Sequence, residues 1–200
     1  MEKIIIIGGG GHSRVLLDIL ALEKARVLGF SDLKEKKDIG IKYLGDDRAI
    51  LKKYPAKDVV LVNGVGSVRL PQERQKIYER FKVLGYRFRP VVHPQSVRSS
   101  NIVLGEGVQI MAGVVINPGV KIAEDVIVNT SASIDHDCRI GAHTHIAPGV
   151  VVSGEVIIGK GCHVGIGAKI RQGTKIGDHV FIKMGAVVVE KEVRAGSILT

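Results

Sequence analysis

A six-residue repeat of hydrophobic positions runs through the second half of the chain. Four residues after each aliphatic position stands a small or aliphatic partner, from Val108 to Ala186, and only the last partner, Glu192, breaks this rule. Two less regular hexads, beginning at Val92, precede the regular ones. The regular aliphatic positions recur without interruption at Leu104, Ile110, Ile116, Ile122, Val128, Ile134, Ile140, Ile146, Val152, Ile158, Val164, Ile170, Ile176, Ile182 and Val188.

A period of six fits neither an α-helix, with 3.6 residues per turn, nor a flat strand, with a period of two. It is typical of a chain that turns a corner every six residues and points two side chains of each side into a narrow core. Repeats of this kind stack into a solenoid, so we expect an all-β parallel β-helix in residues 91–200. Tight corners favour a residue without a β-carbon, and glycine follows the aliphatic position at Gly105, Gly141, Gly159, Gly165 and Gly177.

The first ninety residues alternate short apolar runs with segments of helical spacing, which predicts an α/β domain over residues 1–90. A strand, a glycine loop at 8–11 and a helix follow one another at its start. This order is typical of a Rossmann-like nucleotide-binding unit, in which the glycines let the backbone approach phosphates and the helix start attracts an anion. We expect strands at 2–7, 25–30 and 58–62, a last strand that residues 83–88 lead into, and helices at 13–22, 47–53 and 71–84.

Polar or glycine residues follow the strands of this domain. Asp32 comes after the second strand, and Asn63-Gly64 comes after the third. The carboxyl ends of parallel strands meet at one edge of the sheet, which is where such sheets bind ligands. An acid at Asp32 can hydrogen-bond a ribose or a base, although it can equally be a turn former. A tight turn without a ligand is the alternative for the glycine loop.

The net charge of +9 is concentrated in the first domain. Residues 1–90 carry 19 Lys and Arg against 11 Asp and Glu, whereas residues 91–200 carry ten against nine. The aromatic and basic residues are not interleaved as in nucleic-acid-binding motifs. The charge therefore favours a phosphorylated small molecule over a nucleic acid, with plain solubility as the alternative.

Targeting and redox signals are weak. No apolar run reaches the ~20 residues that span a bilayer, and the apolar start at Ile4 to Ile7 is too short for a signal peptide. We therefore expect a cytoplasmic protein without a membrane span. Cys138 and Cys162 both occupy inward repeat positions, so we expect small core residues rather than a disulfide or a metal site.

Five histidines lie in the repeats, and none of them occupies an inward position. We therefore expect them to face outward or to lie at corners, with a solvated surface residue as the alternative role: His136, His143, His145, His163 and His179. His136 lies within the sequence Asp135-His136-Asp137. A histidine suits the removal of a proton near neutral pH, and an adjacent carboxylate stabilises the imidazolium that forms.

Spacing relates the histidines to one another. His145 and His163 are 18 residues apart, one coil if three hexads close a turn, so they should stack in one column; a metal pair there is a minor alternative. His136 and His145 are nine residues apart, half a coil, so they should point to different sides. A pocket that uses both must combine two chains, which suggests an active site between subunits. Candidate interface residues are Ile127, Val151, Ile157 and Val187, unless these are scattered exposed aliphatics.

Four segments together resemble the sialic acid O-acetyltransferase family of hexapeptide-repeat acyltransferases, and especially its nucleotide-4-amino-sugar (UDP-N-acetylbacillosamine-type) N-acetyltransferases. The segments are Gly10-Gly11-His12, Asn63-Gly64-Val65-Gly66, Val92-His93-Pro94 and Asn129 to Cys138. The resemblance implies a left-handed β-helix, a homotrimer, and acetyl transfer from acetyl-CoA to an amine or hydroxyl of a nucleotide-linked or acidic sugar in bacterial surface glycan biosynthesis. The implied cosubstrate is acetyl-CoA, and no metal is implied.

The resemblance also implies roles for individual residues. His136 falls on the general base and Asp137 on the acid that raises its basicity. Nucleotide-sugar contacts fall on Gly10, Gly11, His12, Asp32 and Gly64, and acetyl-CoA contacts on His145, Gly154, Ile166 and Met184. The chain departs from the familiar pattern where Asp137 replaces Glu and where Lys183-Met184 replace glycines.

We therefore expect an N-acetyltransferase that acts on a nucleotide-linked amino sugar, with a UDP-4-amino-4,6-dideoxy sugar as the leading candidate. The alternative within the family is O-acetylation of sialic acid or a related sugar. A non-catalytic β-helix scaffold or nucleotide-binding protein is an alternative of another class. A sugar nucleotidyltransferase is a further one, although ninety residues leave little room for its first domain.

Overall fold

The computed structural model describes residues 2–200, and the chain divides into two compact units. The first unit contains the residues up to Gly66 and Glu73–Val91, and the second contains Ser67–Gln72 and Val92–Thr200. The Ser67–Gln72 segment therefore belongs with the β-helix, although it lies in the middle of the first ninety residues. No helix among residues 2–200 is long and apolar enough to cross a membrane.

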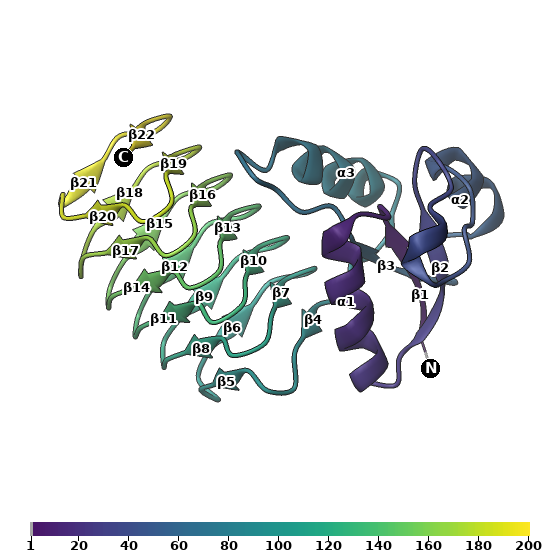
Figure 1. Cartoon of the computed structure of the whole chain (residues 1–200), viewed down its shortest axis with the longest axis horizontal. Coiled ribbons are helices and arrows are strands. Elements are labelled where there is room, and N and C mark those ends of the chain that lie inside the picture. The colour runs from purple at the N-terminus through teal and green to yellow at the C-terminus, as the bar shows by residue number, and fades with distance from the viewer. Residues whose placement is uncertain (1) are drawn as a thin grey trace. The chain divides into compact units, whose positions relative to one another are not determined.

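The first unit has a three-stranded parallel sheet in the order β2-β1-β3 (Figure 1). β1 lies in the centre because its four isoleucines, Ile4 to Ile7, are buried. Helix α1 buries Leu16, Ile19 and Leu20. The elements are β1 Lys3–Ile7, α1 Gly11–Leu22, β2 Arg26–Ser31, the short 3-10 helix η1 Lys37–Ile39, α2 Asp47–Lys53, β3 Val60–Asn63 and α3 Gln72–Val83.

One strand expected in this unit is absent from the described residues. Helix α3 continues to Val83, and the chain then turns at Gly85, whose φ of +82° favours glycine. Phe88 makes only an isolated parallel bridge with Leu61. The last strand, which residues 83–88 were expected to lead into, is therefore reduced to this single bridge, because the helix and its turn take up half of the segment before it.

The second unit is a left-handed parallel β-helix with three flat sides (Figure 1). The first side consists of β4 Val91–Val92, β7 Gln109–Ile110, β10 Ile127–Val128, β13 His145–Ile146, β16 His163–Val164, β19 Phe181–Ile182 and β22 Ile198–Leu199. The second side consists of β5 Val97–Arg98, β8 Val115–Ile116, β11 Ser133–Ile134, β14 Val151–Val152, β17 Lys169–Ile170 and β20 Val187–Val188. The third side consists of β6 Val103–Leu104, β9 Lys121–Ile122, β12 Arg139–Ile140, β15 Ile157–Ile158, β18 Lys175–Ile176 and β21 Glu192–Val193.

Each coil takes 18 residues until the last one. Val128 pairs with Ile146 one coil later, and Ile146 pairs with Val164 in the coil after that. The aliphatic and small repeat positions form one continuous buried core, as the hexad pattern predicts. After Val188 the coil is one residue shorter, because Ile176 pairs with Val193 and Ile182 pairs with Leu199. The irregular Glu192 marks this change of register.

Two kinds of corner position explain the glycines. A β-carbon on Gly141 would lie 2.5 Å from the carbonyl carbon of Gly159 in the next coil, so glycine is needed there for close approach. Three residues after each aliphatic position from Leu104 to Ile182 the backbone is left-handed, which favours glycine, Asn and Asp. Glycine often fills this second position, but six other residues of the repeats have φ between +55° and +60°: Asp125, Ser131, Asp137, His143, Glu155 and His179.

Candidate functional site

His136 lies at a corner of the β-helix, between β11 on the second side and β12 on the third. Its side chain is 44% exposed. Nδ1 lies 3.0 Å from Asp137 Oδ2, so the Nδ1–H group donates to the carboxylate and Nε2 is left as the acceptor. Asp137 has a left-handed φ of +59°, a conformation that Asp tolerates better than most residues. The corner therefore holds Asp137 where it favours the His136 tautomer that carries its proton on Nδ1.

A second carboxylate supports the same corner. Asp135 Oδ1 accepts hydrogen bonds from Asn117 Nδ2 at 2.7 Å and from the His136 backbone N–H at 2.8 Å. The hydrogen bond from Asn117 holds the pKa of Asp135 below its usual value, with help from the His136 N–H. The hydrogen bond to Asp137 raises the pKa of His136, assisted by the charges of Asp135, Asp137 and Glu155. His136 is thus a stronger base than a free histidine.

Gly154 lies directly beside the acceptor nitrogen of this base. It occupies the corner position one coil after His136, and a β-carbon there would come within 2.5 Å of His136 Nε2. The ring of His136 therefore rests on the backbone of Gly154. Among the residues predicted for the site, His136, Asp137 and Gly154 lie together at one corner.

His145 and His163 form a column on the first side, as their spacing predicts. They are paired residues of β13 and β16, and their rings meet edge to face with centroids 5.0 Å apart. Phe181 continues the column by stacking on His163 at 5.4 Å. Both histidines point outward from the β-helix core, as expected, but they are buried, with 6% exposure each. The cause is the Ser67–Gln72 segment, which the repeat pattern could not place.

Ser67 attaches this segment to the histidine column. Its carbonyl oxygen lies 3.1 Å from His145 Nδ1 and accepts the Nδ1 proton. Asn129 Nδ2 lies 3.1 Å from His145 Nε2, consistent with a donor to the unprotonated nitrogen. The Ser67 hydroxyl lies 2.9 Å from His145 Nδ1 and 3.5 Å from His163 Nδ1. Burial lowers the pKa of His163, so that ring is neutral near neutral pH.

A cavity of about 360 Å³ opens beside this column. Three of the four positions that the resemblance assigns to acetyl-CoA line it, namely His145, Ile166 and Met184. Gly154 does not, because it lies at the His136 corner. The remaining lining residues are Ser67, Val68, Asn129, Ala147, Pro148, His163, Gly165 and Phe181. The cavity has an apolar lining without Lys or Arg, which suits an uncharged thioester arm better than phosphates.

The predicted nucleotide-binding residues gather at the carboxyl edge of the small sheet. Ile7 at the end of β1 pairs with Ser31 of β2 and with Asn63 of β3, so the three strand ends lie side by side. Ser13, which stands where a dinucleotide-binding motif has glycine, is buried, and its hydroxyl lies 2.7 Å from the Gly8 oxygen and 3.0 Å from the Gly64 oxygen. The serine thus joins the two glycine loops to each other.

Asp32 holds the glycine loop from the neighbouring strand. Its Oδ2 accepts from the Gly9 N–H at 2.9 Å and lies 2.8 Å from Lys36 Nζ, and its Oδ1 accepts from the Leu33 N–H at 2.7 Å. Burial favours a higher pKa for Asp32, but the hydrogen bonds from Lys36, Gly9 and Leu33 outweigh it and lower the pKa. Asp32 is therefore an ionised carboxylate that already orders the loop before any ligand binds.

The cysteines have no place in this chemistry. Both are buried and free, and burial raises the pKa of each thiol to about 11. Cys138 Sγ donates to the Ser153 carbonyl oxygen at 3.1 Å. Among residues 2–200 there is no cluster of three His, Cys, Asp or Glu side chains arranged to hold a metal ion.

Comparison with known proteins fits this two-part architecture. Residues 3–81 match the family model of the PglD N-terminal domain, and residues 155–189 match that of the bacterial transferase hexapeptide repeats. PerB from Caulobacter crescentus, solved in complex with CoA and GDP-perosamine, is 32% identical, with a TM-score of 0.88 over 97% of this chain and 92% of that chain. The chain belongs to this family of hexapeptide-repeat acyltransferases.

Two further family members show the range of relatives. The acetyltransferase domain of PglB from Neisseria gonorrhoeae, solved with acetyl coenzyme A, is 29% identical, with a TM-score of 0.89 over 98% of this chain and 95% of that chain. The UDP-N-acetylbacillosamine N-acetyltransferase of Bacillus subtilis is 31% identical over 116 residues, which are 56% of this chain and 52% of that enzyme. The match thus spans about half the length of this curated relative.

Several residues of this chain contact the predicted site residues, although the sequence pattern does not indicate these contacts. Ser67 and Val68 line the cavity beside His145 from a segment that no repeat marks. Asn129 begins a segment that carries the resemblance, but nothing in the sequence indicates that its side chain lies 3.1 Å from His145 Nε2. Asn117 could have been found, because it lies 18 residues before Asp135 and therefore in the same column.

Proposed function

We propose that the protein transfers an acetyl group from acetyl-CoA to the amine of a nucleotide-linked amino sugar, with a UDP-4-amino-4,6-dideoxy sugar as the leading candidate acceptor. The observation that carries the proposal is the His136 corner, where a basic nitrogen is left free and its imidazolium is stabilised by Asp137. A scaffold needs no such base. Relatives with the same two-part fold are named as sugar N-acetyltransferases or were solved with CoA and a nucleotide sugar.

The residues suit a direct transfer. His136 Nε2 takes a proton from the sugar ammonium, and the free amine then attacks the thioester carbonyl carbon. The nitrogen releases its second proton to the solvent, the tetrahedral intermediate collapses by breaking the carbon–sulfur bond, and His136 returns its proton to the departing CoA sulfur. A backbone N–H at Gly154, next to Nε2, is our candidate donor to the oxyanion. Cys138 forms no acyl-enzyme, because its thiol is buried and its pKa is raised.

The nucleotide half of the acceptor is assigned to the first unit. Gly10 and Gly11 at the start of α1 are exposed and offer backbone N–H groups, and no side chain caps this helix start. His12 lies in the first turn of the same helix, and Gly64 follows β3. Asp32 is ionised and next to the glycine loop, where it can accept a hydrogen bond from a ribose or a base. The cytoplasmic location expected from the sequence stays a prediction.

We infer that the complete site combines two subunits. The His136 corner joins the second and third sides, whereas His145 and its cavity belong to the first side, which lies opposite that corner of the triangular prism. One chain therefore cannot present both to the same acetyl group. The second side carries a stripe of exposed valines that a neighbouring subunit can cover: Val97, Val115, Val151 and Val187. Ile127, also expected at an interface, is fully buried within the chain.

The acceptor is tested with purified protein, acetyl-CoA and a panel of UDP-, dTDP- and GDP-linked 4-amino sugars beside free sialic acid. Release of the CoA thiol is followed, and the acetylated product is identified by mass spectrometry. Turnover of one nucleotide amino sugar is the expected result. Turnover of sialic acid alone would replace the N-acetyltransferase by an O-acetyltransferase, and the absence of any turnover despite acetyl-CoA binding would contradict the proposed acceptor class.

The shared site is tested by mixing two kinds of impaired subunit at an acetyl-CoA concentration well below KM, where weaker binding of acetyl-CoA lowers the rate. His136→Ala subunits and His145→Ala subunits are unfolded together and refolded, and the assemblies are compared with each variant alone. Recovered activity in the mixture, together with sedimentation as a trimer, is expected if each site draws on two chains. A fully active monomer would contradict the inference.

A further inference from the structure

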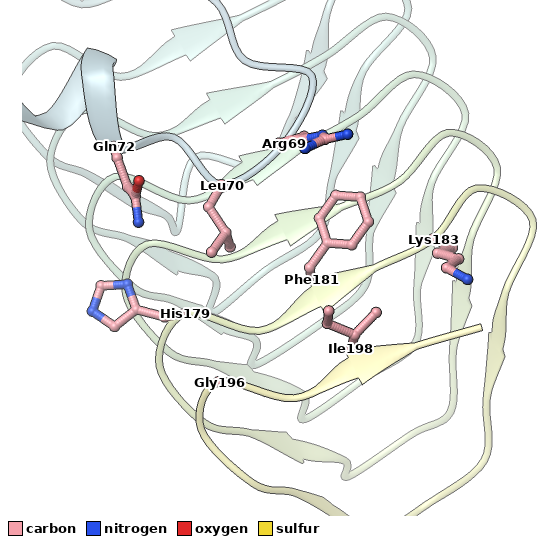
Figure 2. Close-up of a pocket in the computed structure, with 8 residues that line it drawn as sticks. All are labelled: Arg69, Leu70, Gln72, His179, Phe181, Lys183, Gly196 and Ile198. Carbon is pink, nitrogen blue, oxygen red and sulfur yellow. The ribbon is translucent and has the colours of Figure 1, made fainter.

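Arg74 in helix α3 is the only Lys or Arg side chain among residues 2–200 that is buried, with 1% exposure. Cations elsewhere reach open space: Figure 2 shows Arg69 and Lys183 around a cavity of about 450 Å³ in the second unit. A buried guanidinium loses its water and is retained only where hydrogen bonds offset that loss. Arg74 therefore acts through the protein groups that it contacts.

Those groups belong to the turn that follows β3. Arg74 Nη1 donates to the carbonyl oxygens of Asn63 and Val65, at 2.9 Å in each case. In return, Asn63 Nδ2 donates to the Arg74 carbonyl oxygen at 3.1 Å, and Asn63 Oδ1 accepts from the Val65 N–H at 3.3 Å. The turn and helix α3 are thus tied together from both directions.

The contact with Arg74 sets the direction of one backbone N–H group. In a trans peptide the C=O and the N–H point to opposite sides, and the described residues contain no cis peptide bond. The Val65 carbonyl points at Arg74, so the N–H of Gly66 points away from the guanidinium. The N–H groups of Gly64 and Val65 have partners within the first unit, whereas that of Gly66 has none among residues 2–200.

Gly66 lies beside the start of helix α1. A β-carbon on Gly66 would lie 3.2 Å from the β-carbon of His12, in the first turn of that helix. The turn also packs on the glycine loop, because a β-carbon on Gly8 would lie 2.8 Å from Val65 Cγ2. An anion held by the backbone N–H groups at the start of α1 therefore meets the Gly66 N–H as well.

We propose that the Gly66 N–H donates to the diphosphate of the nucleotide-linked acceptor, and that Arg74 is the positioning residue that holds this N–H in place. The inference rests on the proposed function, since it names a contact within the acceptor site. Without a donor at position 74, the carbonyls of Asn63 and Val65 lose their partner and the peptide of Gly66 is free to rotate. Lysine offers one nitrogen without the rigid geometry of the guanidinium, so it replaces arginine only in part.

The contact at Gly66 is tested in the native protein by nuclear magnetic resonance. With ¹³C at the valine carbonyl carbons and ¹⁵N in glycine, an experiment that selects Val–Gly peptide bonds reports the amides of Gly66 and Gly165 alone. Gly165 is the internal control, because its N–H donates to the Ile182 carbonyl oxygen within the β-helix. UDP, dTDP and GDP are added in turn. We expect the nucleotide that binds to move the Gly66 amide proton downfield and to leave that of Gly165 in place.

The role of Arg74 is tested by calorimetric binding of the same nucleotides and of CoA. Arg74→Met removes every donor and keeps an apolar side chain, Arg74→Lys keeps the charge, and Lys76→Gln changes an exposed cation of the same helix as the matched control. We expect Arg74→Met to bind the nucleotide about tenfold or more weakly, with Arg74→Lys between it and the control. The affinity for CoA should stay the same in all of them, because its contacts are assigned to the β-helix.

The outcomes separate this inference from the proposed function. A bound nucleotide that leaves the Gly66 signal unmoved overturns the contact but not the acceptor class, and native protein that binds none of the three nucleotides overturns both. Unchanged nucleotide affinity in Arg74→Met, or a loss that is equal for nucleotide and CoA and follows a fall in unfolding temperature, overturns the positioning role. If Arg74→Met does not fold, Arg74→Lys is judged by the same criteria.

Discussion

Two histidine sites on the same β-helix have opposite surroundings. His136 is half-exposed, is bonded to a carboxylate and has a raised pKa, whereas His163 is buried and has a lowered pKa. His145, beside His163, is held by the Ser67 carbonyl and the Asn129 amide, which are neutral partners. Histidine therefore has a raised pKa at a corner of the β-helix and a lowered pKa on a covered side. A corner suits a base, and a covered side suits a neutral hydrogen-bonding group.

The largest effect should come from the base itself. His136→Ala should lower kcat by about a hundredfold or more, because general base catalysis is lost. The matched control is Lys175→Ala, which removes an exposed side chain from the third side of the same β-helix. Steady-state acetyl transfer is the measurement. Equal rates in the two variants would contradict the assignment of His136 as the general base.

A substitution next to the base should come second. Gly154→Ala places a β-carbon 2.5 Å from His136 Nε2, so the ring must move away from its position. We expect kcat to fall about tenfold or more, since a misplaced base loses proximity. Gln172→Ala, one coil further along the same column, is the control. If Gly154→Ala lost activity only through a large fall in unfolding temperature, the positioning role would be disproved.

The covered side should show a smaller effect of a different kind. His145→Gln should raise the KM for acetyl-CoA about fivefold, since one net hydrogen bond is worth about 1 kcal/mol. The pH at which kcat/KM reaches half its maximum should stay as in the native enzyme, because His145 is not the base. A shift of that pH would mean that His145, and not His136, is the base whose protonation limits the rate.

The finest distinction is in pH dependence. His136 must be unprotonated to act, so activity is lost as the pH falls through its raised pKa. Asp137→Asn removes the main cause of the raised pKa, and the midpoint of the kcat/KM profile should move to lower pH, with a modest fall in the plateau rate. Glu155→Gln is the control, because Glu155 is the smallest of the stated charge contributions. A midpoint that moves upward in Asp137→Asn would contradict the assignment.

The hydrophobic pattern of the sequence predicts the β-helix and the histidine column, but it does not predict which groups cover that column. The hexads predict that His145 and His163 share a column, since coil length follows from local corners. They say nothing about Ser67, which meets His145 from 78 positions away, because a contact of that range depends on how the whole chain folds. In the same way the glycine loop was predicted, but the buried hydroxyl of Ser13 that links it to Gly64 was not.

The regular coil has a consequence for how the family can diversify. An insertion or deletion of one whole coil keeps every later residue in its column and moves it along the axis by about 4.8 Å, the spacing of neighbouring strands. Any other length moves later residues out of their columns unless a corner absorbs the difference. The single shortened coil, after Val188, absorbs one missing residue and keeps the last strands in their columns. Gene duplication can therefore lengthen or shorten the distance between ligand contacts in fixed steps, whereas finer adjustment falls to side chains and to the segment that covers the first side.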